Sequence, residues 1–136
     1  RPYYGIETAN LTFKGADRRL VRVTLTRGSL FGAGEGLTLP DCRDLVAAIA
    51  ADMGKRFGVS VDEMTGRERS DAAAEYSVEL ARKAKANGDS TTVTVDLARR
   101  GFSVRTGEGV VCCSVNGQVG VEDGAGCLVV SVCAEP

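Results

Sequence analysis

Alternating hydrophobic and polar positions near the start of the chain predict a pair of β-strands. In residues 9–14, Leu11 and Phe13 fall on one face, and residues 20–26 repeat the alternation after a turn at 15–18. Because successive side chains of a strand point to opposite faces, this spacing is typical of half-buried strands. Such segments joined by a tight turn predict antiparallel pairing.

The last third of the chain shows the same alternation, and residues 109–133 contain four of the five cysteines. Within that stretch, Asn116-Gly117 is the strongest short hairpin signal, because both residues accept positive φ. We therefore predict that the chain reverses there and again at 122–125. The predicted strands are 91–97, 102–105, 109–115, a return from 118, and 126–133, with a turn at 99–101.

Between these β-rich ends, the hydrophobic period changes to that of a helix. Apolar residues recur at i, i+3, i+4, i+7 and i+11, which predicts one buried stripe: Cys42, Leu45, Val46, Ile49 and Met53. Asp41 is the expected N-cap, and Gly58 is the expected stop after Phe57. After a polar, irregular segment at 59–69, we expect a second helix that is capped by Ser70 or Asp71 and runs to about residue 86. Its predicted apolar face is Ala73, Tyr76, Leu80 and Ala84.

The order of these elements predicts an α+β fold in a single domain spanning residues 1–136. We expect an antiparallel sheet of about five to seven short strands in the order β-β-α-α-β-β-β-β, with two helices packed on one face. A parallel doubly wound sheet would need strands that alternate with helices, and this chain lacks that alternation.

Charge and composition exclude several functions. The net charge is −1, and Arg18-Arg19, Arg99-Arg100 and the Arg67/Arg69 pair are interpreted as solvated surface, so no nucleic-acid partner is expected. The chain has no histidine, which removes Ser-His-Asp and Cys-His catalysis and histidine-containing zinc sites. We expect no catalytic residues, no metal and no cofactor. No apolar run reaches the length of a membrane span.

The five cysteines, Cys42, Cys112, Cys113, Cys127 and Cys133, are disulfide candidates. Cys112 and Cys113 are neighbours, so at most one of them shares a face of the sheet with Cys127 and Cys133. In a secreted protein, an odd number leaves one thiol free or bonded to another chain. The preferred arrangement joins Cys42 to a cysteine of 109–133, Cys113 for example, and closes a second bridge within that region. Buried, reduced cysteines are the alternative.

Other features bear on the compartment and on ligands. Asn10-Leu11-Thr12 is an N-glycosylation sequon, meaningful in a secreted eukaryotic protein. The chain begins at Arg1, which fits a cleaved signal peptide or a trimmed chain. Residues 28–36 are glycine-rich, but the helix expected directly after a dinucleotide-binding loop does not follow, which favours a flexible or bulged loop.

The sequence Asp-Cys-x-x-Leu-x-x-x-Ile at Asp41, Cys42, Leu45 and Ile49, opening a helix between a strand pair and a cysteine-bearing sheet, resembles fungal killer-toxin-like and small secreted effector proteins. The resemblance implies an αβ sandwich stapled by disulfides. It also implies secretion and a non-enzymatic role in virulence, with a protein or cell-surface target on a host or competitor cell.

Two other functions stay open. One is an intracellular adaptor or assembly subunit with reduced, buried cysteines. The other is an enzyme with a thiol site at Cys42, because a helix N-terminus and the neighbouring Arg43 favour a thiolate.

Overall fold

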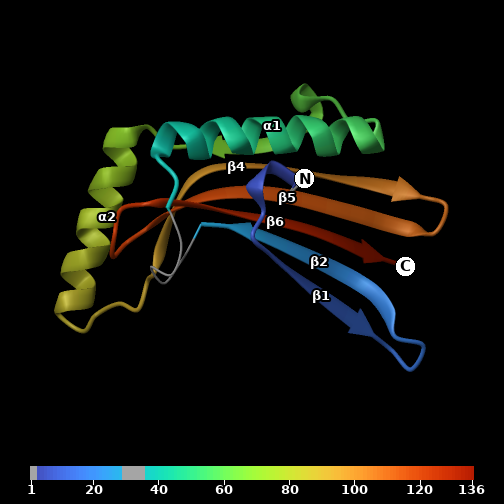
Figure 1. Cartoon of the computed structure of the whole chain (residues 1–136), viewed down its shortest axis with the longest axis horizontal. Coiled ribbons are helices and arrows are strands. Elements are labelled where there is room, and N and C mark those ends of the chain that lie inside the picture. Colours follow the sequence, from blue (N-terminus) through green and yellow to red (C-terminus); the bar gives the residue numbers. More distant parts are fainter. Residues whose placement is uncertain (1–2, 29–35) are drawn as a thin grey trace.

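The protein is an antiparallel sheet with two helices packed against one face, as Figure 1 shows for the computed structural model. The structure describes residues 3–28 and 36–136. The strands are β1 (Thr8–Lys14), β2 (Arg19–Arg27), β3 (Thr65–Glu68), β4 (Thr94–Thr106), β5 (Gly109–Gly120) and β6 (Gly126–Glu135), arranged in space as β1-β2-β6-β5-β4-β3. The helices are α1 (Leu39–Phe57) and α2 (Asp71–Ala86), and short 3₁₀ turns lie at η1 (Tyr3–Gly5) and η2 (Val61–Glu63). The predicted α+β class is therefore confirmed, with six strands in the sheet.

The two faces of the sheet differ because each central strand alternates. Along β5, Cys113 and Val115 are buried beneath the helices, whereas Ser114 and Asn116 are only half-buried on the opposite side. We call these sides the helix face and the open face. The core lies between the helix face and α1, and its largest fully buried side chains include Ile49, Leu97, Leu128, Val115 and Val130. Burying one such side chain contributes about 1.5–3 kcal/mol.

Helix α1 has well-defined ends. Thr38 is the N-cap, because its hydroxyl oxygen accepts a hydrogen bond of 3.2 Å from the backbone N–H of Asp41. The prediction that Asp41 caps the helix is therefore wrong. Asp41 lies in the first turn, where its negative charge interacts favourably with the positive end of the helix dipole. Gly58 ends the helix with φ of 70°, as predicted.

The predicted hairpin turn at Asn116-Gly117 is wrong, because both residues lie inside the continuous strand β5. Gly117 has a packing role instead. A Cβ atom at this position would lie 2.8 Å from the Cys42 sulfur and 2.9 Å from a methyl carbon of Val46. Only glycine lets α1 approach the sheet this closely. Gly117 is therefore required for helix packing and does not form a turn.

Two segments are more regular than their sequences predict. Residues 65–68, expected to be irregular, form the edge strand β3, so the order of elements is β-β-α-β-α-β-β-β rather than β-β-α-α-β-β-β-β. The turn expected at 99–101 is absent, and β4 runs unbroken from Thr94 to Thr106. Pairing with β3 and β5 on either side supplies hydrogen bonds to this part of the chain.

Ser70 is the N-cap of helix α2, as one of the two predicted alternatives has it. Its hydroxyl oxygen accepts a hydrogen bond from the backbone N–H of Ala73. The predicted apolar face of the helix is wrong. Ala74 and Val78 are the buried residues, whereas Tyr76 is 66% exposed and Leu80 is 49% exposed. The buried stripe of α2 is narrow and consists of small side chains. The prediction was wrong because it placed the larger apolar residues, Tyr76 and Leu80, on the buried face.

The β1–β2 hairpin forms as predicted and extends beyond the helices (Figure 1). Leu11 and Phe13 share the helix face with Val23 and Leu25, but α1 lies over β4, β5 and β6. Leu11 and Phe13 therefore remain 55% and 53% exposed.

Replacing Gly117 with alanine tests the packing constraint beneath α1. The new methyl group must displace Cys42 and Val46, so we expect a loss of about 1–3 kcal/mol in the free energy of unfolding. Gly107→Ala is the matched control, because nothing lies within 4 Å of its Cβ position. Urea unfolding of both variants measures the difference, and a Gly117→Ala protein as stable as the control would contradict the account.

Candidate anion-binding site

A β-bulge in β4 brings charged side chains together at the edge of the open face. The pairing with β5 shifts between Asp96 and Ala98, so Leu97 is the extra residue. Without the bulge, Asp96 and Arg99 would point to opposite faces, because they are three positions apart and successive side chains alternate. With it, both pair with open-face positions of β5, Gln118 and Asn116.

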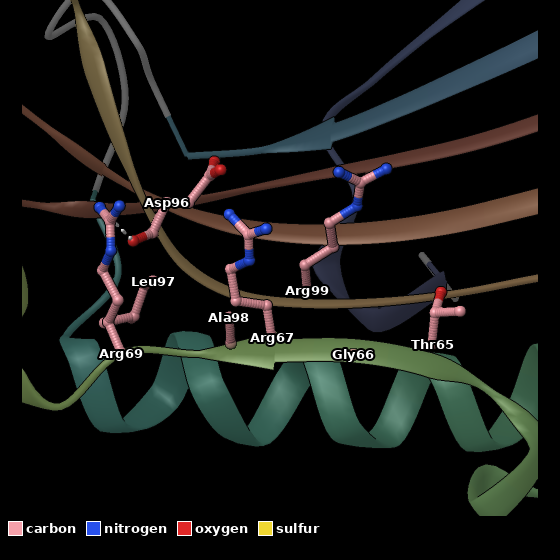
Figure 2. A pocket seen from close by; sticks show the side chains of 8 residues that line it. All are labelled: Thr65, Gly66, Arg67, Arg69, Asp96, Leu97, Ala98 and Arg99. Carbon is pink, nitrogen blue, oxygen red and sulfur yellow. Dashed lines mark hydrogen bonds between the residues drawn. The ribbon is translucent and has the colours of Figure 1, made fainter.

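Strand β3 and the residue that follows it add two further arginines beside this bulge. Arg67 pairs directly with Arg99, and the backbone N–H of Arg69 donates to the Leu97 carbonyl at 2.8 Å. Figure 2 shows the side chains of Arg67, Arg69 and Arg99 pointing the same way, away from α1. Together they border a cavity of about 160 Å³, which is lined by Thr65, Gly66, Arg67, Arg69, Asp96, Leu97, Ala98 and Arg99. We call this cavity the arginine cleft.

The cleft carries a net positive charge, because three arginines and one carboxylate, that of Asp96, line it. Arg67 and Arg99 stand directly opposite each other, and like charges in that arrangement destabilise a strand pair. In residues 3–28 and 36–136, no carboxylate forms an ion pair with any of the three guanidinium groups. Arg69 donates instead to the backbone carbonyl of Asp96 at 3.3 Å. By contrast, the guanidinium group of Arg43 in α1 forms ion pairs with the carboxylates of Glu68 and Asp71, with N–O distances of 3.0 and 2.6 Å.

This geometry suits an anion. A guanidinium group presents N–H donors in a planar fork that matches carboxylate, phosphate or sulfate oxygens. A bound anion would also remove the repulsion between Arg67 and Arg99. Among the residues that line the cleft, Thr65 carries the one hydroxyl group and Asp96 the one carboxylate.

The cysteines divide into accessible and buried sets. Cys112 and Cys133 are direct cross-strand partners on the open face and are half-buried, and the Ser103 hydroxyl lies 3.3 Å from the Cys112 sulfur. Cys42, Cys113 and Cys127 are buried at 0%, 4% and 2% exposure. All five are free thiols in this structure. The prediction that Cys112 and Cys113 face opposite ways is confirmed.

Cys42 lies beside Cys127 rather than beside Cys113. The Cys42 thiol donates to the backbone carbonyl of Cys127 at 3.4 Å. Cys113 is four residues along β5 from Gly117, the position beneath Cys42, or about 13 Å away. Burial raises the pKa of the Cys42 thiol, and it outweighs the opposing effects of a backbone hydrogen bond and Arg43. These features weigh against a thiolate at Cys42.

The remaining candidates lie apart from the cleft. Asn10 is exposed on the open face of edge strand β1, where the sequon is accessible. Most of the glycine-rich segment, residues 29–35, lies outside the described residues. Among those that are described, no group of three or more Cys, Asp or Glu side chains is placed to hold a metal ion. No helix in the described ranges is long and apolar enough to cross a membrane.

Sequence reasoning missed the arginine cleft. It interpreted Arg67/Arg69 and Arg99-Arg100 as separate solvated surface, because residues 65–68 were not expected to form a strand. The available signal was the spacing Arg67-x-Arg69, which puts both side chains on one face of an extended segment.

Comparisons with known proteins add no relative. No family model matches this chain, and searches of curated proteins and of solved structures find no match either.

Thiol labelling of the reduced, native protein tests the cysteine assignment. At about pH 8, we expect Cys112 and Cys133 to react first with a maleimide. Burial raises the pKa of both Cys113 and Cys127 to about 11, so they should react only after unfolding, together with Cys42. The Cys112→Ser/Cys133→Ser variant should lose the fast phase. Rapid labelling of Cys42 in that variant would instead favour a thiol enzyme.

Proposed function

We propose that this protein is a non-enzymatic binding protein that captures an anionic group of its target in the arginine cleft. The observation that carries the proposal is the direct pairing of Arg67 with Arg99 where no described carboxylate neutralises them. Like charges directly opposite each other destabilise a strand pair, and a bound anion would relieve that repulsion. Because the cleft lies at the sheet edge, it is open to a group carried by a large partner.

We further propose that the protein is secreted and acts on a host or competitor cell as an effector or toxin. The placement of Cys112 opposite Cys133 supports this part. Directly opposite residues bring their Cβ atoms to about 4.5–5.5 Å, close to the 3.5–4.5 Å that a disulfide needs. In an oxidising compartment, these two thiols would lose two protons and two electrons to a disulfide-bearing oxidant, which is itself reduced to thiols.

The alternatives receive less support. An intracellular adaptor would keep every cysteine reduced. The direct pairing of Cys112 with Cys133 would then have no role as a crosslink. A Cys42 enzyme would need an accessible thiolate, and Cys42 is fully buried.

Titration with inorganic sulfate and phosphate at low salt tests the cleft. We expect NMR shifts in the amides of β3 and the adjoining part of β4, with weak affinity that falls as salt is added. Arg67→Ala/Arg99→Ala should weaken binding by at least about tenfold, because charge-assisted hydrogen bonds are lost. Lys83→Ala/Lys85→Ala removes the same charge from exposed positions of α2 and should bind like the unmodified protein. Equal losses in both variants would mean that only net charge matters.

Mass spectrometry of protein secreted from a eukaryotic host tests the compartment. We expect Cys112 and Cys133 to resist alkylation until they are reduced, with a mass lower by the two hydrogen atoms lost. In Cys133→Ser, Cys112 should become alkylatable without reduction. If both cysteines of the unmodified protein alkylate freely after unfolding without reductant, the secreted, crosslinked form is wrong.

A further inference from the structure

The open face carries a polar trough that crosses the whole sheet. The strand registers align Thr65, Gly101, Ser114, Ser131, Thr24 and Asn10 in one row from β3 to β1. Every member of this row is glycine, a hydroxyl residue or an amide. With neighbouring strands about 4.8 Å apart, the row is about 24 Å long. We call it the polar trough.

Arginines stand on both sides of this trough. The row on one side runs Arg67, Arg99, Asn116, Val129, Thr26 and Thr8, and the row on the other runs Ser103, Cys112, Cys133, Arg22 and Thr12. The arginine cleft thus lies beside the β3–β4 end of the trough, and Arg22 lies three strands beyond β4 on the opposite side. Arg22 is exposed and forms no ion pair with a described carboxylate.

The trough is hollow at its centre. A cavity of about 620 Å³ extends between Arg99 and Arg22, and its lining includes Gly101, Ser114 and Ser131. Small side chains make this hollow, because larger ones at the same positions would fill it. One acidic side chain, Glu63, also borders it. Phe102 borders it from the helix face, where its ring packs on Phe57 with centroids 5.8 Å apart.

We propose that the polar trough binds a linear acidic polysaccharide, whose carboxylate or sulfate groups are held by the arginine cleft at one end and by Arg22 at the other. This proposal rests on the proposed function and names its ligand. A chain ligand fits because the charged positions are separated by a row of hydroxyl and amide groups, which can hydrogen-bond sugar hydroxyls.

The open face argues against a nucleic acid. Proteins that bind single strands stack bases on aromatic side chains, and none of the positions in the three rows is aromatic. The net charge of the chain is −1, so the positive charge is local to this face rather than a general property. A ligand with regularly spaced anions and no bases is the better match.

The test compares ligands of different length and backbone by calorimetry at one salt concentration. The probes are a heparin-derived octasaccharide, the corresponding disaccharide, an oligogalacturonate, a neutral dextran oligosaccharide and a single-stranded DNA oligonucleotide. We expect an acidic octasaccharide to bind at least about tenfold more tightly than the disaccharide, because only the longer chain reaches both arginine sites. Dextran should not bind, and DNA should bind more weakly than the acidic glycans.

Variants locate the binding mode. Arg22→Ala should weaken octasaccharide binding by about tenfold and leave sulfate and disaccharide binding unchanged, and Arg22→Lys should restore part of the loss. Ser131→Asp places a negative charge in the trough and should weaken the octasaccharide alone. Circular dichroism and thermal unfolding establish that each variant is folded. Lys83→Ala/Lys85→Ala again controls for net charge.

The outcomes separate the two proposals. If Arg67→Ala/Arg99→Ala abolishes octasaccharide binding but Arg22→Ala and Ser131→Asp have no effect, the trough is wrong and the cleft stands. If neither sulfate nor any acidic glycan binds, the proposed function itself fails. If DNA binds as tightly as the acidic glycans and shows the same dependence on Arg22, the polysaccharide assignment is overturned.

Discussion

The close contact between α1 and the sheet at Gly117 and Gly126 is the constraint on which the rest of the structure depends. A Cβ atom at Gly126 would lie 3.0 Å from the Cys42 Cβ, and Gly126 also exchanges backbone hydrogen bonds of 2.9 and 2.7 Å with Leu37. These contacts fix where α1 starts and how deeply it sits. Helix α1 therefore covers one face of β4, β5 and β6, and α2 packs on the same side of the sheet (Figure 1). The opposite face is left free of helices, which allows it to carry polar and charged residues.

The fold class follows from the sequence because period-2 and period-3.6 patterns are local. The β1–β2 hairpin and the span of each helix could be predicted from alternation, capping residues and Gly58. What could not be predicted depends on neighbours distant in the chain. Asn116-Gly117 has the composition of a turn, yet α1 requires glycine there, and β3 is a strand only because β4 offers it an edge. Tyr76 and Leu80 marked the wrong face of α2, because the buried contacts are made by the smaller Ala74 and Val78.

The candidate site shows the same division. The sequence shows that Cys112 and Cys113 point to opposite faces, since this needs only the geometry of one strand. It does not show that Arg67 faces Arg99 or that Ser114 faces Ser131, because these pairings depend on register. The bulge at Leu97 has no sequence signature, and it alone puts Asp96 and Arg99 on one face. Local pattern thus identifies the elements, whereas the proposed binding surface arises from how the strands align.

We propose that the protein binds its ligand on the open face of the sheet. Paramagnetic relaxation enhancement from an acidic oligosaccharide that carries a terminal spin label tests this most directly. We expect strong broadening of amides around the polar trough, at Ser114, Ser131 and Thr24, and little effect on the solvent side of α1 and α2. Broadening centred on the helices, or on the exposed apolar side of the β1–β2 hairpin at Leu11 and Phe13, would contradict it.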